Sequence, residues 1–143
     1  MNMGIRPEAE KQGKSKPLGT EVDENKKTVL IYSPDLNFCF SLSILFQDRY
    51  NVITTTNLSM LERFVGSYSA GLLIIDAGPS EKLIEHLENL KGSNNQLPII
   101  MLYVYNSKDA KLDRVIRERV DSVFYKPFEI GSVSQRVTEL LTD

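Results

Sequence analysis

LLIIDAGPS, residues 72–80, joins a continuous apolar run to an abrupt polar end. The run has the length and the branched side chains of a buried strand. It stops at Asp76, and Gly78 and Pro79 follow as turn-forming residues. Asp76 is therefore either a chemically active group or simply the first polar side chain to reach water. The pattern of the other residues helps to distinguish the two.

Four further short apolar runs resemble this one and alternate with amphipathic stretches. Strands are predicted at TVLIY (28–32), NVITT (51–55), GLLII (71–75), LPIIML (97–102) and DSVFY (121–125). Apolar residues at helical spacing predict one-faced helices at 83–90, 112–120 and 130–141. The segment 36–48 is apolar on more than one side, and the weakest helical pattern lies at 58–68. This alternation predicts an α/β protein with a doubly wound parallel sheet covered on both faces.

Composition limits the function more than it defines it. A chain of 143 residues with 25% charged residues and a net charge of −2 is typical of one globular domain, without the basic excess of a nucleic-acid or membrane-surface binder. Single copies of Cys39 and His86 exclude an internal disulfide, a multi-cysteine metal site and a His-rich site. No signal peptide or membrane-spanning run is recognisable, so we expect a cytoplasmic protein with no membrane partner.

The first 26 residues differ in composition from the rest. They carry five charges of each sign, no aromatic residue and no apolar period. We predict a disordered polar tail at 1–26 and a single domain at 27–143, with docking by the tail as the open alternative.

In a sheet of this kind, chemistry gathers at the carboxyl ends of the strands. The residues predicted there are Ser33, Pro34, Asp35, Asp76, Tyr103, Lys126 and Pro127. A carboxylate such as Asp76 can attack phosphorus, and a nearby Lys126 can neutralise the acyl phosphate formed, usually with a divalent cation. The structural alternative is a partly buried ion pair between the two side chains.

These residues resemble the receiver domains of bacterial two-component response regulators, over roughly residues 27–141. The resemblance rests on the fivefold alternation, on Asp76 closing the third strand, on PIIML (98–102) and above all on YKPF (125–128). It implies the flavodoxin-like receiver fold, with strand order 2-1-3-4-5. It also implies that Asp76 is the phosphoacceptor, that Lys126 contacts the phosphate and that the Lys126–Pro127 bond is cis. The implied partner is a signalling protein, a histidine kinase or a downstream target, and the domain is not expected to be an enzyme.

The departures from the family pattern concern the groups that bind the phosphoryl group and its metal. Ser33 and Pro34 stand where the family has two adjacent acids that hold Mg²⁺, and Asp35 comes one position late. Tyr103 replaces a Thr or Ser, and Val123 replaces the aromatic residue that rotates on activation. We therefore predict an atypical receiver with impaired Mg²⁺-dependent phosphorylation. Asp35 and Asp76 are the remaining candidate ligands for Mg²⁺, and a phosphorylation-competent single-domain regulator is the alternative.

Several of these residues also have structural interpretations. Ser33, Pro34 and Asp35 fit the N-cap, N1 and N2 positions of a helix. An aromatic cluster of Tyr32, Tyr103 and Tyr105 would fill the space of a phosphoryl group. His86 is expected on the solvated surface and Cys39 in the core.

The charged residues of segment 108–119 predict mainly a solvated face with i,i+4 ion pairs, Asp113 with Arg117 among them. By the resemblance, this helix with the fifth strand and the last helix would form a docking or homodimer surface. A small flavodoxin-like cofactor-binding or enzymatic domain is an alternative from another class. It would need a glycine-rich phosphate loop, and YSPDLNF (32–38) has no glycine.

Overall fold

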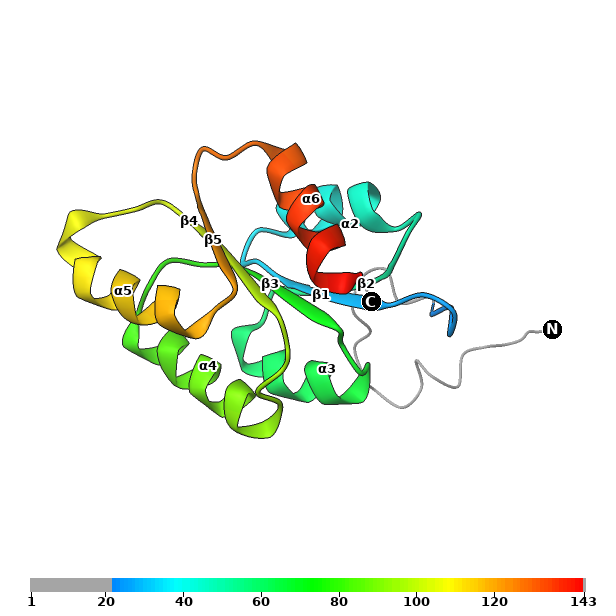
Figure 1. The fold of residues 1–143 in the computed structure, drawn as a ribbon, viewed down its shortest axis with the longest axis horizontal. Helices are drawn as coiled ribbons and strands as arrows, with labels where there is room; N and C mark the ends of the chain where they lie inside the picture. Colours follow the sequence, from blue (N-terminus) through cyan, green and yellow to red (C-terminus); the bar gives the residue numbers. More distant parts are fainter. Residues whose placement is uncertain (1–21, 143) are drawn as a thin grey trace.

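The computed structural model of the protein describes residues 22–142 as alternating strands and helices (Figure 1). The strands are β1 (Thr28–Tyr32), β2 (Asn51–Thr55), β3 (Leu72–Asp76), β4 (Ile99–Tyr103) and β5 (Ser122–Tyr125). The α-helices are α2 (Leu36–Phe46), α3 (Leu61–Ser67), α4 (Glu81–Ser93), α5 (Ala110–Arg119) and α6 (Ile130–Leu141). Two short 3₁₀ turns, η1 (Leu58–Met60) and η2 (Ser107–Asp109), precede α3 and α5.

All five strands are parallel and run in the order β2-β1-β3-β4-β5, which confirms the predicted sheet. Tyr32 in β1 lies opposite Ile75 in β3. The residue after each, Ser33 and Asp76, therefore reaches the same edge of the sheet. Register thus brings together two polar residues that are far apart in the sequence.

Helices cover both faces of the sheet. Figure 1 shows α2 and α6 on one side and α3, α4 and α5 on the other. Each layer encloses its own apolar core, one including Phe46 and Val137 and the other Leu61 and Leu87. Every residue of β1, β3 and β4 is buried, as burial on both faces requires. No helix within residues 22–142 is long and apolar enough to cross a membrane.

The weak helical pattern at 58–68 corresponds to a divided element. Asn57 accepts a hydrogen bond from the backbone N–H of Ser59 and starts η1, and the α-helix begins only at Leu61. Ser80 caps α4 in the same way, through its bond from the N–H of Leu83 at 3.0 Å. The predicted helix at 83–90 is longer in the structure because this cap starts it at Glu81.

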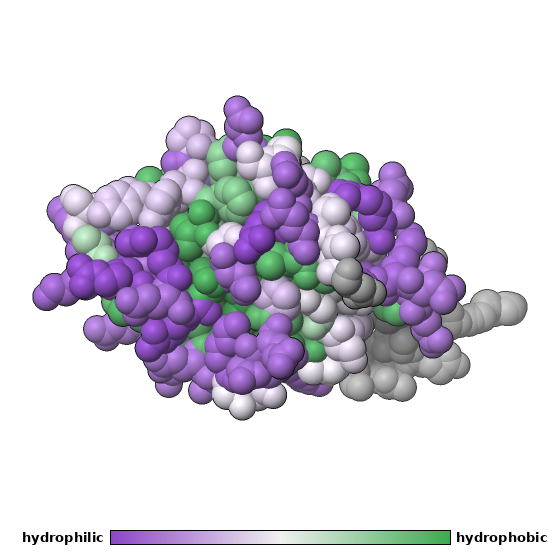
Figure 2. Space-filling view, in the orientation of Figure 1, coloured by the Kyte–Doolittle hydropathy of each residue, from purple (hydrophilic) through white to green (hydrophobic). Residues whose placement is uncertain are grey.

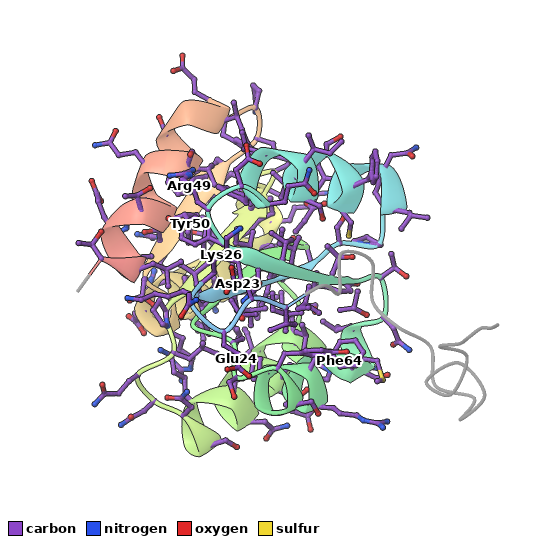
Figure 3. The ribbon with its side chains drawn as sticks, turned by 90° about the vertical axis from the view of Figure 1, so that its right-hand side faces the viewer. Asp23, Glu24, Lys26, Arg49, Tyr50 and Phe64 are labelled. Atoms are coloured by element: carbon purple, nitrogen blue, oxygen red, sulfur yellow. The ribbon has the colours of Figure 1, made fainter. Side chains whose placement is uncertain are left out.

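Contacts with the sheet begin before the predicted domain boundary at residue 27. Asp23 and Lys26 form a turn that Figure 3 shows beside β2. The side chain of Asn51 holds this turn, because its Oδ1 accepts from the N–H of Asp23 at 2.7 Å and its Nδ2 donates to the Asp23 carbonyl at 2.7 Å. In the connection between α2 and β2, Arg49 lies beside α6 (Figure 3). Its guanidinium donates hydrogen bonds to the hydroxyls of Ser134 and Thr138 in that helix. Residues 1–21 of the predicted tail lie outside the described residues.

Candidate strand-end site

Asp76 is the centre of the carboxyl edge of the sheet, and both of its oxygens have partners. It is 7% exposed. Its Oδ1 lies 2.5 Å from Nζ of Lys126, and its Oδ2 accepts a hydrogen bond from Oγ of Ser33 at 2.7 Å. The predicted proximity of carboxylate and ammonium is thus present, together with a hydroxyl partner that the sequence did not predict.

Lys126 reaches Asp76 from the end of β5. Its backbone N–H donates to the carbonyl of Tyr103 at 2.9 Å, which keeps it on the sheet edge, and the Lys126–Pro127 bond is cis as predicted. The side chain is 36% exposed, and Nζ lies 5.4 Å from the ring centroid of Phe38. The ammonium of Lys126 therefore contacts both the carboxylate of Asp76 and the ring of Phe38, and it remains partly accessible to water.

The predicted N-cap role of Ser33 is wrong. Ser33 is fully buried, and its Oγ accepts from the N–H of Asp35 at 3.0 Å while it donates to Asp76. Asp35 is the N-cap of α2 instead, accepting from the N–H groups of Asn37 at 2.9 Å and Phe38 at 3.4 Å. Because the strand register places Ser33 against Asp76, its hydroxyl does not cap α2. The cap is Asp35, the next residue with a side-chain oxygen.

The donor set at this edge does not fit Mg²⁺. The ion requires near-octahedral oxygen coordination, usually with carboxylate ligands. One oxygen of Asp76 is paired with an ammonium and the other with a neutral hydroxyl, while Asp35 caps a helix with its carboxylate. Among residues 22–142, no three His, Cys, Asp or Glu side chains gather closely enough to hold a metal ion.

Tyr103 does not take the place of the family hydroxyl beside Asp76. Its hydroxyl donates to Oδ1 of Asp113 in α5 at 2.5 Å. The hydroxyl of Tyr125 donates to the same oxygen at 2.9 Å, and Nε of Arg117 donates to Oδ2 at 2.9 Å. We call these four residues the Asp113 cluster. The predicted i,i+4 ion pair between Asp113 and Arg117 is present, and Arg117 is 54% exposed on the solvated face. Asp113 itself is only 2% exposed, because its carboxylate points inward to the two phenols.

The Asp113 cluster strongly favours an ionised carboxylate beside neutral phenols. Burial opposes ionisation of Asp113, but hydrogen bonds from Tyr103, Tyr125 and Arg117 outweigh it and hold the pKa below its ordinary value. Burial and the nearby carboxylate raise the pKa values of Tyr103 and Tyr125. The hydrogen bond to Asp113 also raises the pKa of Arg117. Charge within the cluster is therefore fixed over the whole neutral pH range.

An aromatic cluster exists beside α5, but it consists of Tyr103, Tyr105 and Tyr125 and does not include the predicted Tyr32. The ring of Tyr125 packs edge-on against Tyr103 and Tyr105, with centroids 5.6 and 5.5 Å apart. A surface cavity of about 550 Å³ borders this group, lined by Tyr105, Tyr125, Arg114 and Arg117 among others. Tyr32 is buried in the core at the end of β1, where burial and then the charge of Asp76 raise its pKa.

His86 is not the solvated residue that the sequence predicts. Its side chain is 15% exposed, and Nδ1 lies 2.9 Å from Oε2 of Glu62. The packing of α3 beside α4 brings the carboxylate over the imidazole. Cys39 is fully buried, which confirms its predicted place in the core, and burial raises its pKa.

Two residues of this region could not be assigned their roles from the sequence, Ser33 and Asp113. For Asp113 a signal exists, because it stands three residues before Ile116 and seven before Val120 and so falls on the buried stripe of its helix. For Ser33 the signal is the strand register, which the sequence alone does not give.

Comparisons with known proteins relate the chain to others by fold. No family model matches it, and no curated protein matches it in sequence. A Burkholderia pseudomallei protein described as pilus assembly-related is 22% identical, with a TM-score of 0.66, over 84% of this chain and 92% of its own. Vibrio cholerae chemotaxis protein CheY4 is 17% identical, with a TM-score of 0.68, over 81% and 99%. The N-terminal signal receiver domain of a Bacteroides fragilis response regulator is 16% identical, with a TM-score of 0.68, over 82% and 98%.

These neighbours include chemotaxis, response-regulator and pilus-assembly proteins, so they share an architecture more than a single task. The chain has the strand order and the two helical layers of a receiver domain, and it covers nearly the whole length of its receiver-type neighbours. The chain therefore has the flavodoxin-like fold of the response-regulator receiver domains.

Proposed function

We propose that this protein is an atypical receiver-type signalling domain that acts by protein–protein contact, without Mg²⁺-dependent phosphorylation at Asp76. It would be a binding module and not an enzyme. The observation that carries the proposal is the pairing of both Asp76 oxygens, one with Lys126 and one with Ser33.

Electrostatics explains why this pairing disfavours a phosphoryl group. Asp76 and Lys126 carry one charge each, and together they are neutral at an almost buried edge. A phosphoryl group would bring a charge of about −1.5 to −2 to the same place. Lys126 alone cannot neutralise that charge, and the donor set offers no place for a dication. The phosphorylated state is then costly, and Asp76 serves mainly to tie the end of β3 to the residues that follow β1 and β5.

For the partner, we infer a surface formed by α5, β5 and α6. Lys111, Arg114 and Arg117 are exposed on α5, beside the exposed rings of Tyr105 and Tyr125. A homodimer predicted for this surface would bring like charges together across its symmetry axis. An acidic segment of a signalling protein, such as a histidine kinase or a downstream target, has the better complementarity.

The cofactor-binding alternative gains no support from the loop after β1. A phosphate group would need free backbone N–H groups at the start of α2. The N–H groups of Asn37 and Phe38 are already bonded to Asp35.

A phosphodonor assay tests the proposal. The full chain is incubated with Mg²⁺ and acetyl phosphate, and its intact mass is measured. We expect no adduct of about 80 Da, the mass of one phosphoryl group. The matched variant Ser33→Asp/Pro34→Asp restores the acidic pair, so we expect it to gain an adduct that is lost when Asp76→Asn is added. An adduct on wild-type Asp76 would favour the phosphorylation-competent alternative.

A further inference from the structure

Helix α2 exposes an apolar stripe to solvent. Leu36, Phe40 and Ile44 are 59%, 53% and 52% exposed, and they follow one another at intervals of four residues. Leu45 adds a further 39% exposed side chain on the same helix. Hydrophobic residues emerge at the upper edge of the space-filling view, over α2 (Figure 2). The opposite side of α2 is occupied in the ordinary way, with Leu42 and Phe46 in the core.

This stripe is not explained by the fold itself. Because α2 already buries one side against the sheet, its outer side would be expected to be polar. Instead, no charged residue occurs between Asp35 and Asp48. The other helix of the same layer, α6, has a mainly polar outer side: Val133 and Val137 are buried, and Gln135, Thr138 and Glu139 are exposed. Its exposed large apolar residue is Ile130, at its first position. An exposed apolar face of this kind marks an interaction surface.

We infer that the outer face of α2 binds the same face of a second copy of this chain, forming a symmetric dimer centred on Phe40. Residues spaced by four form the ridge that packs into the matching groove of another helix, with axes crossing at about 50°. A twofold axis at the crossing pairs each stripe with itself. The inference is independent of what happens at Asp76, which lies at the strand end and not on this face.

The area available agrees with a dimer interface. At these exposed fractions Leu36, Phe40 and Ile44 present on the order of 300 Å² of apolar surface on one face of the helix. A standard interface buries about 800 Å² on each partner, of which somewhat more than half is non-polar. The stripe therefore supplies most of the apolar centre, and polar neighbours such as Asn37 and Ser41 on α2 and Gln47 at its C-cap would form the rim.

Charge favours a second copy as the occupant. A charged surface repels its own copy, as the basic side of α5 would, whereas an uncharged stripe pays no such penalty. The same lack of charge gives an acidic or basic partner nothing to recognise. Of these two surfaces, α2 is thus suited to a like partner and α5 to an unlike one.

Sedimentation velocity on the full chain, from micromolar to millimolar concentration, tests the inference. We expect a reversible monomer–dimer equilibrium whose dissociation constant rises at least about tenfold in Phe40→Glu, because that residue lies at the centre of the contact. The matched control is Val22→Glu, which places the same charge at an exposed apolar residue outside both α2 and the α5 surface and should leave the equilibrium unchanged. Circular dichroism verifies that both variants are folded.

A cross-linking variant gives a second readout that does not depend on weakening the dimer. Ser41→Cys places an exposed thiol beside the stripe, and mild oxidation should produce a covalent dimer, whereas Ser107→Cys in η2 should not. A monomeric mass at every concentration would overturn the inference and leave the stripe to an unlike partner. So would a dimer that Arg114→Glu disrupts and Phe40→Glu does not.

Discussion

Asp76 and Asp113 are two almost buried carboxylates that the fold satisfies in different ways. Asp76 ends a strand and pairs with an ammonium that is 36% exposed and with a serine hydroxyl. Asp113 lies within a helix and accepts from two phenols and a guanidinium. Tyr103 links the two regions. Its backbone ends β4 at the same sheet edge as Asp76, and its hydroxyl donates to Asp113 in α5. The hydroxyl of Tyr103 thus anchors α5 to the sheet through Asp113.

Removing the Asp113 carboxylate should have the largest effect on stability. In Asp113→Ala, the buried hydroxyl of Tyr103 loses its acceptor, and the cluster loses three hydrogen bonds. We expect the free energy of unfolding to fall by about 3 kcal/mol. Urea unfolding measures it, with Asp109→Ala as the control, because Asp109 at the end of η2 precedes the same helix without a side-chain capping bond. A loss below about 1 kcal/mol would show that the cluster is not an anchor.

The two phenols of the cluster should differ in the same measurement. Tyr103 is buried and Tyr125 is partly exposed, so water can replace only the second hydroxyl. We expect Tyr103→Phe to cost about 1.5 kcal/mol and Tyr125→Phe about 0.5 kcal/mol. Equal losses would mean that burial does not separate the two bonds.

Neutralising Asp76 should cost less than removing Asp113. In Asp76→Asn, Ser33 can still donate to the amide oxygen, and Lys126 can turn toward water. We expect a loss of about 1 kcal/mol or less, since Lys126 is 36% exposed and water can solvate its ammonium once Asp76 is neutral. If Asp76→Asn lowers the free energy of unfolding as much as Asp113→Ala does, the pair of Asp76 and Lys126 is more shielded from water than its solvent exposure indicates.

The smallest expected effect is on the pH dependence of stability. The folded-state pKa of Asp113 is lowered, so its contribution is present above the unfolded value of about 3.9 and is lost as pH falls through the folded value. The pKa values of Tyr103 and Tyr125 are raised, so their contribution is present below about pH 10 and is lost as pH rises further. Unfolding across both windows should show weaker slopes in Asp113→Asn than in the wild type. Unchanged slopes would assign them to other groups.

The sequence predicts the fold well because each strand is a separate apolar run and each helix has its own period. The meeting of Asp76 and Lys126 follows from the same pattern, since parallel strands end at one edge. Ser33 could not be assigned, because its partner depends on the register of β1 against β3. Tyr103 and Asp113 could not be assigned because the rotation of a helix about its axis decides where a carboxylate on its buried stripe finds donors.

A Mg²⁺ titration followed by amide NMR tests most directly the claim that Ser33 and Lys126 occupy both oxygens of Asp76 in place of a metal ion. We predict no saturable shift of the amides around Asp76 at millimolar Mg²⁺ in the wild type, and saturable shifts at the same amides in Ser33→Asp/Pro34→Asp. Saturable binding at the wild-type strand end, abolished by Asp76→Asn, would contradict the account.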